Sequence, residues 1–558
     1  MVMASEEVEM HRVEDGNPQP HGGRVLIIGL DGATFDLIEP WAEAGYLPNL
    51  ARLMTQGVWG RLQSTIPAHS GPAWATFATG LLPGKHGVYF FLGPSRDRQY
   101  FRPLSAETIR GWRFWELASD QGRTVGVVNV PLTFPPHPVN GYTIAGLFAP
   151  DAASAFSSPE LYQRVLEHCG GYVVEAAKHR QRQRYLADMM AGMELRCRVA
   201  EYLMEHHPVD LFVVVFRMID SIMHHFWADM DPDHPLRYRL GKSLRPNAIL
   251  DAYRLLDDAV GRLVARAESD TTVFVMSDHG FRAEYKRFSV NKWLRERGLF
   301  TLRRGRGPLT TMAGMTIKRL GLAKLAKRAL HQMTGSSWQT AVWAAVDWSR
   351  TQVVYGPGPA FYVNLKGRDA EGIVPTSEYE RLRERLIAEF KKVRDPETGL
   401  PVVAKVYRRE DIYQGDAVDL APDLVPEAAE YVTDGRRWGY GFEPFPGVNW
   451  SFRTAERYAG VHAQDGIFIA YGPHVVAGQG IKVHIADLAP TSLYTLGLAV
   501  PQAMDGKVQM ELFDSSHVAA YPVQYEDREI HTNGKVGQVM PEEDEAIIEA
   551  RLRDLGYL

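Results

Sequence analysis

The chain has 558 residues, of which 45% are hydrophobic and 23% charged, so it has enough apolar residues for a large globular core. Its 62 basic and 67 acidic residues give a formal net charge of −5, which excludes a whole-chain attraction to nucleic acid or to an anionic membrane. Only Cys169 and Cys197 are present, which excludes a disulfide framework and a cysteine-based zinc cluster.

The first 22 residues predict a disordered tail. They contain acidic side chains where a signal peptide would be basic, and they lack a continuous apolar stretch. No later run of about eighteen apolar residues predicts a transmembrane helix. The expected location is therefore cytoplasmic.

Short apolar runs alternate with helical patterns from residue 24 onward. Runs rich in β-branched residues predict strands buried on both faces, over 24–30, 124–130, 211–216, 272–277 and 466–472. Helices are predicted over 47–56, 106–121, 184–206, 248–267 and 377–392. This alternation predicts an α/β fold with a mostly parallel central sheet, flanked by helices on both faces.

The pattern breaks between residues 302 and 335, which hold eight basic and no acidic residues. Such a segment is either a solvated helix face or a basic lid that docks an anionic surface or substrate. The predicted organisation is a tail over 1–22, a discontinuous catalytic core over 23–300 and 345–515, a basic helical insertion or lid over 301–344, and a C-terminal extension over 516–558. This extension ends in an amphipathic helix.

Polar side chains follow three of the predicted strands. Asp31 follows the first strand, Asp278 and His279 follow the fourth, and Asp220 and His224 lie shortly after the third. Ligands of open α/β sheets bind outside the carboxyl ends of the strands, so these side chains should meet at one edge. Each of them alone has an ordinary interpretation, because an Asp after a strand commonly caps a helix and a buried His is usually a core residue.

His462 precedes the last predicted strand, where a loop could return it to the same edge. It completes a set of six Asp and His residues, enough for two divalent ions with three ligands each. Oxygen and imidazole donors suit Zn²⁺ or Mn²⁺, and two such ions are a recurring device in phosphoryl transfer.

Ser70, in the stretch "IPAHSGPAW", has two interpretations. Ser is a favoured helix cap and Pro72 fits a first helical turn, so a helix is predicted to start there. The positive end of that helix would also stabilise an alkoxide and a bound phosphate, which suits a nucleophile. Spacing alone leaves both interpretations open.

These motifs resemble those of the type I phosphodiesterase/nucleotide pyrophosphatase family, in the alkaline phosphatase superfamily. The resemblance covers residues 24–500, includes "LPNLARLMTQG", "FATGLLPGKHG" and "VNKWLRERGLF", and keeps the order Asp31, Ser70, Asp220-x-x-x-His224, Asp278-His279 and His462. It implies an alkaline-phosphatase-like core. It also implies that Asp220, His224 and His462 bind one ion, and that Asp31, Asp278 and His279 bind a second ion that contacts the nucleophile.

The resemblance further implies that Ser70 is the nucleophile, with Ser64 and Thr65 as fallbacks. The implied reaction is hydrolysis of a phosphodiester or phosphoanhydride through a phosphoseryl intermediate, with a nucleotide or another small phosphodiester as substrate. No sequence-specific binding of nucleic acid is expected, and peripheral membrane contact through 302–335 stays open.

One position departs from the family pattern. The pyrophosphatases place a phosphate-holding Asn three residues after the nucleophile, where this chain has Ala73. Backbone N–H groups of the Ser70 turn are one replacement, and His69, Lys85 and His86 are candidate side chains.

Several alternatives use the same scaffold. Phosphomonoester or phosphonate hydrolysis remains open, as does handling of a phosphorylated lipid or glycan at a membrane surface. A sulfatase is disfavoured because Trp74 stands where sulfatases require Arg. A cofactor-independent phosphoglycerate mutase is disfavoured by the lack of a large insertion after Ser70. The stretch "APDLV" around Asp423 predicts only a turn before a strand.

Overall fold

The fold is known from a computed structural model that describes residues 22–94, 101–176, 179, 181–303, 345–445, 447–455, 458–530 and 541–555. The predicted tail over 1–22 lies outside the described residues except for Gly22, and the predicted basic insertion over 301–344 lies outside them except for its first three residues.

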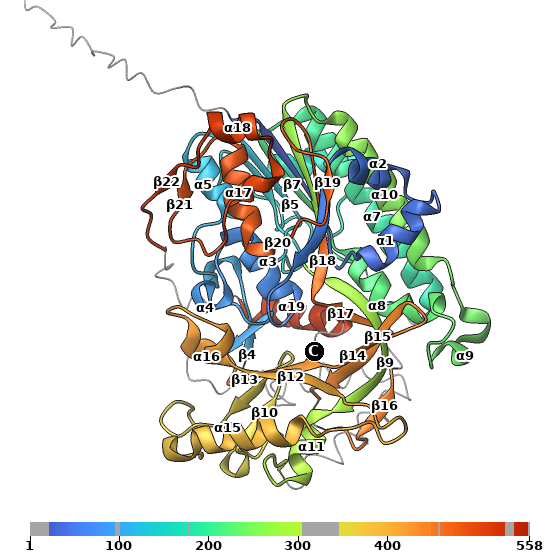
Figure 1. The fold of residues 1–558 in the computed structure, drawn as a ribbon, viewed down its shortest axis with the longest axis vertical. Helices are drawn as coiled ribbons and strands as arrows, with labels where there is room; N and C mark the ends of the chain where they lie inside the picture. The colour runs from blue at the N-terminus through green and yellow to red at the C-terminus, as the bar shows by residue number, and fades with distance from the viewer. Residues whose placement is uncertain are drawn as a thin grey trace, which may run out of the picture.

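A nine-stranded sheet forms the centre of the larger lobe (Figure 1). Its order is β19-β2-β18-β8-β1-β7-β5-β6, and β20 also pairs with β2. The strands are β1 (Arg24–Leu30), β2 (Val58–Gln63), β5 (Val125–Val128), β6 (Gly141–Ile144), β7 (Leu211–Phe216), β8 (Thr271–Met276), β18 (Asp465–Tyr471), β19 (Gly478–Gln479) and β20 (Val483–His484). Strands β8, β1, β7, β5 and β6 are parallel, whereas β18 runs antiparallel to both of its neighbours. The predicted mostly parallel sheet is confirmed.

Helices cover both faces of this sheet, so its central strands are buried on both sides. In β1, Leu26 and Ile28 belong to one hydrophobic cluster, while Val25 and Ile27 belong to a second one. The first cluster includes residues of α1 (Phe35–Glu43), α2 (Pro48–Gln56), α6 (Pro159–Cys169), α7 (Arg182–His206), α8 (Met218–Met230) and α10 (Ala248–Arg266). The second includes residues of α3 (Ser70–Thr79), α5 (Phe114–Asp120) and α17 (Leu488–Thr495).

A smaller lobe lies below the main sheet in Figure 1 and has its own hydrophobic cluster. It contains a four-stranded sheet, β10-β11-β13-β12, and a five-stranded sheet in which β9 pairs with β15, β16 and β17. The strands are β9 (Gly280–Ser289), β10 (Val353–Tyr355), β11 (Phe361–Val363), β12 (Val403–Arg408), β13 (Leu424–Ala428), β14 (Glu430–Thr433), β15 (Arg436–Glu443), β16 (Phe452–Thr454) and β17 (Gly460–Ala463). The helices are α11 (Val290–Glu296), α15 (Thr376–Phe390) and α16 (Arg409–Ile412).

The predicted elements agree with the structure to within a few residues, with one exception. The single helix predicted over 106–121 is wrong, because only a 3₁₀ turn, Ala106–Thr108, and the short helix α5 form there. Gly111, with a φ of 92°, interrupts the pattern between them.

The predicted core segment 345–515 divides between the two lobes. Residues 353–454 build the smaller sheets, whereas β18, β19, β20 and α17 belong to the main sheet and its cover. The division of the chain into domains stays a prediction.

The last described helix, α19 (Glu542–Leu555), lies between the two lobes in Figure 1. Ile548 and Leu552 are fully buried in a hydrophobic cluster that also contains Phe90 and Phe91. Arg551 of the same helix donates hydrogen bonds to the backbone oxygens of residues 147, 149 and 150. The extension is therefore packed against the larger lobe.

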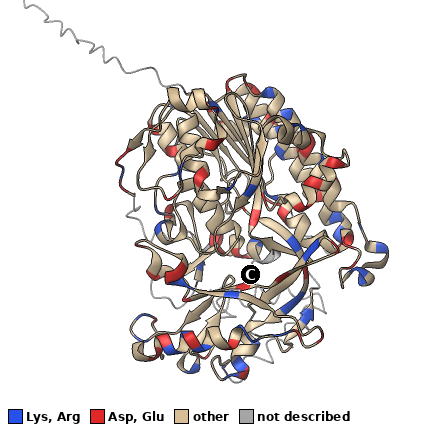
Figure 2. Cartoon of the chain, in the orientation of Figure 1, with Lys and Arg blue, Asp and Glu red and all other residues tan. Residues whose placement is uncertain are grey.

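Charged side chains of both signs are interspersed over the outer helices (Figure 2). This distribution agrees with the small net charge of the sequence. No helix within the described ranges is long and apolar enough to cross a membrane.

Candidate active site at the carboxyl edge of the main sheet

Three neighbouring strands end at the same level. Leu30, the last residue of β1, pairs with Phe216, the last residue of β7, and Gly29 pairs with Met276, the last residue of β8. The residues after these strands, including Asp31 and Asp278, therefore emerge together at one edge, as predicted for an open parallel sheet.

His462 reaches the same edge from a strand, although a loop was expected. It lies in β17, which pairs antiparallel with β9, and its partner there is Phe281. Because β9 begins directly after His279, this register brings the two imidazoles together. Their ring centroids are 3.7 Å apart and their planes differ by 22°.

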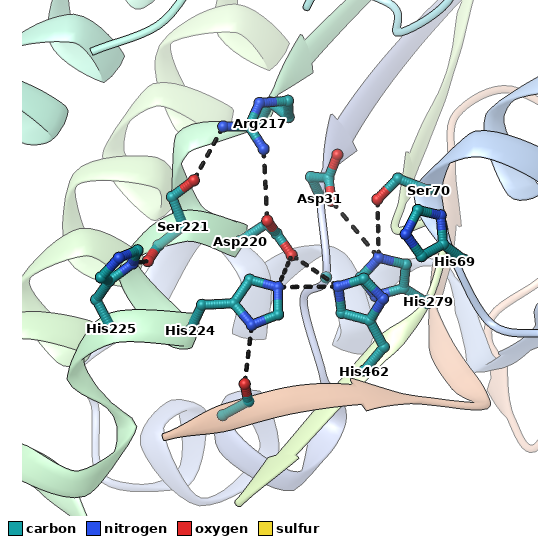
Figure 3. Close-up of polar contacts among 12 residues, drawn as sticks. Asp31, His69, Ser70, Arg217, Asp220, Ser221, His224, His225, His279 and His462 are labelled. Atoms are coloured by element: carbon teal, nitrogen blue, oxygen red, sulfur yellow. Dashed lines mark hydrogen bonds and ion pairs between the residues drawn. The ribbon is translucent and has the colours of Figure 1, made fainter. Parts of the chain in front are cut away.

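Asp220, His224 and His462 form one compact group (Figure 3). Asp220 lies in the first turn of α8 and His224 one turn later, so both side chains project from the same helix face. One carboxylate oxygen of Asp220, Oδ1, lies 3.3 Å from the Nε2 atoms of both histidines. These two Nε2 atoms are 3.0 Å apart.

Backbone carbonyls hold the outer nitrogen of each imidazole. Nδ1 of His224 lies 2.8 Å from the oxygen of Gly460, and Nδ1 of His279 lies 3.0 Å from that of Gly280. Nδ1 of His462 lies 3.2 Å from the oxygen of residue 68. A carbonyl can only accept, so each Nδ1–H donates, and in the neutral ring each Nε2 lone pair faces the centre of the cluster.

Asp31, Asp220 and His279 form a second compact group, in which one ligand atom of each lies within 4.8 Å of the others. Asp220 thus belongs to both groups. Asp278 adjoins the second group, because its Oδ2 lies 3.3 Å from Nε2 of His279, while its Oδ1 accepts a hydrogen bond from the backbone of Gly32.

Burial shifts the protonation of these groups. Burial, followed by the charges of Asp278 and Asp220, raises the pKa of Asp31 well above its usual range. Burial and the charge of Asp220 raise the pKa of Asp278 to about 7. Burial would also raise the pKa of Asp220, but His224 and His462 outweigh it and hold that pKa well below its usual range.

Burial shifts the pKa values of the imidazoles in the opposite direction, downward. Burial and the neighbouring His279 lower the pKa of His462 to about 3. Burial likewise lowers the pKa of His279 itself. Both rings are therefore neutral near pH 7, which is the form that binds metals.

The residues present fit divalent metal ions. Three buried carboxylates and three imidazole lone pairs converge at this point. Among the described residues, few hydrogen-bond donors face them. Oδ1 of Asp31 is buried and accepts no hydrogen bond from any described residue. Two facing Nε2 lone pairs at 3.0 Å repel each other unless a cation lies between them. The number and identity of the ions stay predictions.

Ser70 adjoins this cluster from helix α3. Its hydroxyl Oγ lies 3.1 Å from Nε2 of His279, and the side chain is 1% exposed. The expectation that Ser70 caps the helix is wrong. His69 occupies the N-cap and its Nδ1 accepts from the backbone N–H of Gly71, while Ser70 is the first helical residue. Its hydroxyl is thus left to face the imidazole.

His69 lies at the site as predicted, but as a capping residue. Its ring packs against Phe90, Phe91 and His462, at centroid distances of 4.4, 5.0 and 5.5 Å. Burial and the neighbouring histidines lower the pKa of His69 well below its usual range. The ring is therefore neutral near pH 7, as a capping acceptor must be.

The structure does not bring Lys85 and His86 to the cluster. Lys85 forms an ion pair of 2.6 Å with Asp505, and His86 is fully buried with its Nε2 2.9 Å from the hydroxyl of Thr76. None of the described contacts of either residue involves the cluster. They were predicted at the site because they are close to Ser70 in sequence. However, α4 (Pro83–His86) follows the end of α3 that lies away from Ser70.

The fallback nucleophiles also point elsewhere. The hydroxyl of Ser64 donates to the backbone oxygen of Asp278 at 2.6 Å, and that of Thr65 donates to the backbone oxygen of Pro67 at 2.9 Å. Ala73 is fully buried in α3.

Two contributing residues were missed in the sequence. The indole N–H of Trp74 donates to Oδ2 of Asp31 at 3.1 Å, and Nη1 of Arg217 lies 3.4 Å from Oδ2 of Asp220. Arg217 comes directly after β7, so the rule that selected Asp31 and Asp278 should have selected it. Trp74 carries no comparable signal, because an apolar helical residue is usually core.

The sequence model of the family described as type I phosphodiesterase / nucleotide pyrophosphatase matches residues 25–443, which end before His462. No curated protein matches the chain.

Two solved structures illustrate the similarity of fold. Phosphonoacetate hydrolase from Sinorhizobium meliloti 1021, in complex with phosphonoformate, is 13% identical, with a TM-score of 0.50 and coverage of 86% of this chain and 96% of its own. Human ectonucleotide pyrophosphatase / phosphodiesterase 5 is 15% identical, with a TM-score of 0.47 and coverage of 88% and 100%. Identities this low describe the fold alone.

Proposed function

Because this chain belongs to the type I phosphodiesterase/nucleotide pyrophosphatase family, we propose that it is a two-metal hydrolase that cleaves phosphodiester or phosphoanhydride bonds. Membership supports a phosphoric ester hydrolase, and the predicted alkaline-phosphatase-like fold is confirmed. The observation that carries the proposal is a cluster of six Asp and His side chains that lies beside the hydroxyl of Ser70. Figure 3 labels all of these residues except Asp278.

Asp220, His224 and His462 would hold one ion, and Asp31, Asp278 and His279 the other. Divalent ions bound by these residues would lower the pKa of the nucleophile and neutralise charge on the phosphoryl oxygens. Zn²⁺ suits the donor set best, and Mn²⁺ is compatible with it.

Ser70 attacks phosphorus in this proposal. The bond from its Oγ to phosphorus forms as the bond to the leaving oxygen breaks, and water then releases the phosphoryl group from Ser70. The hydroxyl lies 3.1 Å from Nε2 of His279, so Ser70 lies beside the place of the ion that His279 would bind. The positive end of the α3 dipole stabilises the negative charge that develops there.

The side chain of Ala73 affects which substrates the site can bind. A methyl group offers no donor to a phosphoryl oxygen, so the hold that the family Asn provides must come from elsewhere. This leaves phosphomonoester or phosphonate hydrolysis on the same site as the second candidate. A role on phosphorylated lipid or glycan depends on residues 302–335, most of which lie outside the described ranges. A cytoplasmic location stays a prediction.

The test uses the full chain reconstituted with Zn²⁺ or Mn²⁺. We expect p-nitrophenol release from bis-p-nitrophenyl phosphate and from the p-nitrophenyl ester of thymidine monophosphate to exceed release from p-nitrophenyl phosphate. A preference for p-nitrophenyl phosphate would favour the monoester alternative. Ser70→Ala should abolish turnover and leave the metal content unchanged, and turnover by that variant would refute the assignment of Ser70.

A further inference from the structure

Arg217 is buried behind Asp220, on the side away from the three histidines (Figure 3). Its side chain is 3% exposed and lies between two carboxylates. Nη1 lies 3.4 Å from Oδ2 of Asp220, and Nε donates to Oε2 of Glu175 at 2.7 Å. Nη2 donates to the hydroxyl of Ser221 at 2.9 Å.

The two oxygens of Asp220 therefore have different surroundings. Oδ2 faces the guanidinium of Arg217, whereas Oδ1 lies 3.3 Å from Nε2 of both His224 and His462. The contact between Arg217 and Asp220 is a single one, from Nη1 to Oδ2, because Nη2 and Nε of the same guanidinium face Ser221 and Glu175. A charge-assisted contact of this kind favours the rotation of Asp220 that leaves Oδ1 to the histidines.

Glu175 is the partner that holds Arg217 in this orientation. Its side chain is 4% exposed, so the ion pair is desolvated on both sides. Buried pairs of this kind stabilise little in net terms, because desolvation offsets the attraction. The placement of this pair beside the one carboxylate that belongs to both ligand groups points to a role in the site.

We propose that Arg217 is a positioning residue for the metal centre, held by Glu175, which orients Asp220 so that Oδ1 faces His224 and His462. This inference rests on the proposed function. It predicts that loss of Arg217 weakens metal binding and lowers kcat, while KM for a soluble diester stays unchanged at saturating metal.

The experiment measures Zn²⁺ and Mn²⁺ affinity by calorimetric titration of the metal-free full chain, so it needs no turnover. Arg217→Gln should weaken binding by about 10- to 100-fold, the range seen when groups that orient metal ligands are lost. Arg217→Lys keeps the charge but cannot reach both carboxylates, so its affinity should lie between those of Arg217→Gln and the wild type. Glu175→Gln should weaken binding in the same direction.

A matched control comes from the smaller lobe. Arg383 is 1% exposed and donates to Glu410 at 2.9 Å, so Arg383→Gln removes an equally buried arginine away from the site. Glu410→Gln removes its partner, whose side chain is 49% exposed. These controls should leave metal affinity unchanged. Wild-type affinity in Arg217→Gln, or an equal loss in Arg383→Gln, would overturn the inference.

The outcomes separate this inference from the proposed function. A wild-type chain that binds metal and cleaves diesters, together with an Arg217→Gln variant that does both equally well, would overturn the positioning role alone. A wild-type chain that binds neither Zn²⁺ nor Mn²⁺ would overturn the proposed function and this inference with it.

Discussion

Three backbone carbonyls fix the orientation and the tautomer of the histidines in the cluster. Each accepts from an Nδ1–H, on His224, His279 or His462, and thereby directs the other ring nitrogen inward. Burial keeps His279 and His462 neutral. A set of inward lone pairs beside buried carboxylates is a good metal site.

Asp278 should make metal binding depend on pH. Its pKa is raised to about 7 by burial and by Asp220, whereas an unfolded chain loses that proton near about pH 4. The folded metal-free chain binds more protons across this window, so its free energy of unfolding should fall as the pH rises from about 4 to about 7. Metal binding needs the carboxylate, so Zn²⁺ affinity should rise over the upper part of the window.

Calorimetric titrations and denaturant melts over about three pH units, from about pH 5 to about pH 8, would measure both effects. Asp278→Asn should flatten both dependences. An unchanged pH profile in that variant would assign the dependence to other groups.

Asp423 has a structural role that the sequence did not reveal. It is fully buried and accepts from the backbone of Val363 at 2.6 Å, from Nη1 of Arg368 at 2.6 Å and from the hydroxyl of Tyr379 at 2.5 Å. Burial alone would raise its pKa, but Arg368 and these hydrogen bonds hold that pKa below its usual range. The carboxylate therefore ties β11, β13 and α15 together.

Asp423→Asn should lower the free energy of unfolding by about 3 kcal/mol, because it removes the fully buried of the two carboxylates that pair with Arg368 and leaves only Asp369. Denaturant melts would measure the loss. Asp434→Asn, at an exposed turn with a φ of 49°, is the matched control and should change little. A loss in Asp423→Asn no larger than in the control would contradict the role assigned here.

At the scale of elements, α19 supports the nucleophile indirectly. Leu552 packs in the cluster that contains Phe90 and Phe91, and these two rings contact His69, the cap of α3. The position of Ser70 thus depends on a helix hundreds of residues later in the chain.

Leu552→Ala should release α19 and lower kcat/KM, at a cost of about 3 kcal/mol in the free energy of the docked helix. Hydrogen exchange should rise in 541–555 and in 88–92. Ile547 is 44% exposed on the same helix, so Ile547→Ala is the control and should alter neither exchange nor turnover. Equal effects of the two substitutions would show that docking through Leu552 is not what matters.

The sequence predicted the strand-end part of the site well because parallel strands must deliver their last residues to one edge. Asp31, Asp278 and His279 needed nothing more than that rule. His462 was predicted in the right place for a wrong reason, since its position depends on the pairing of β17 with β9, far apart in sequence. Glu175 lies in an irregular segment without periodicity, so its pairing with Arg217 is visible only in three dimensions.

At the scale of the whole molecule, the cluster joins the two lobes. Asp31, Asp220 and Asp278 come from the main sheet and its helix, whereas His462 comes from a strand paired with β9, which continues into the smaller lobe. A metal ion held by both sets would bind the native chain and not the unfolded one. Its binding free energy is then available to stabilise both lobes.

Removing metal should therefore lower the unfolding temperature of the chain. Free metal at 100 times its Kd stabilises the native state by about 2.7 kcal/mol for each site. Differential scanning calorimetry with chelator and with added Zn²⁺ or Mn²⁺ would measure the shift. Asp220→Asn, which removes a charge shared by both ligand groups, should abolish most of it. A shift of the same size in that variant would place the bound metal elsewhere.

The route of the chain through the smaller lobe has a consequence for how such enzymes diversify. The chain leaves the cluster at His279, enters β9 and returns to the cluster at His462 in β17, the strand next to it. The chain between these two strands therefore starts and ends at a single pair of hydrogen-bonded strands. Residues between the two strands can be added, lost or replaced while the pairing of β9 with β17 keeps the two imidazoles in register. The smaller lobe can thus change without a change in the cluster.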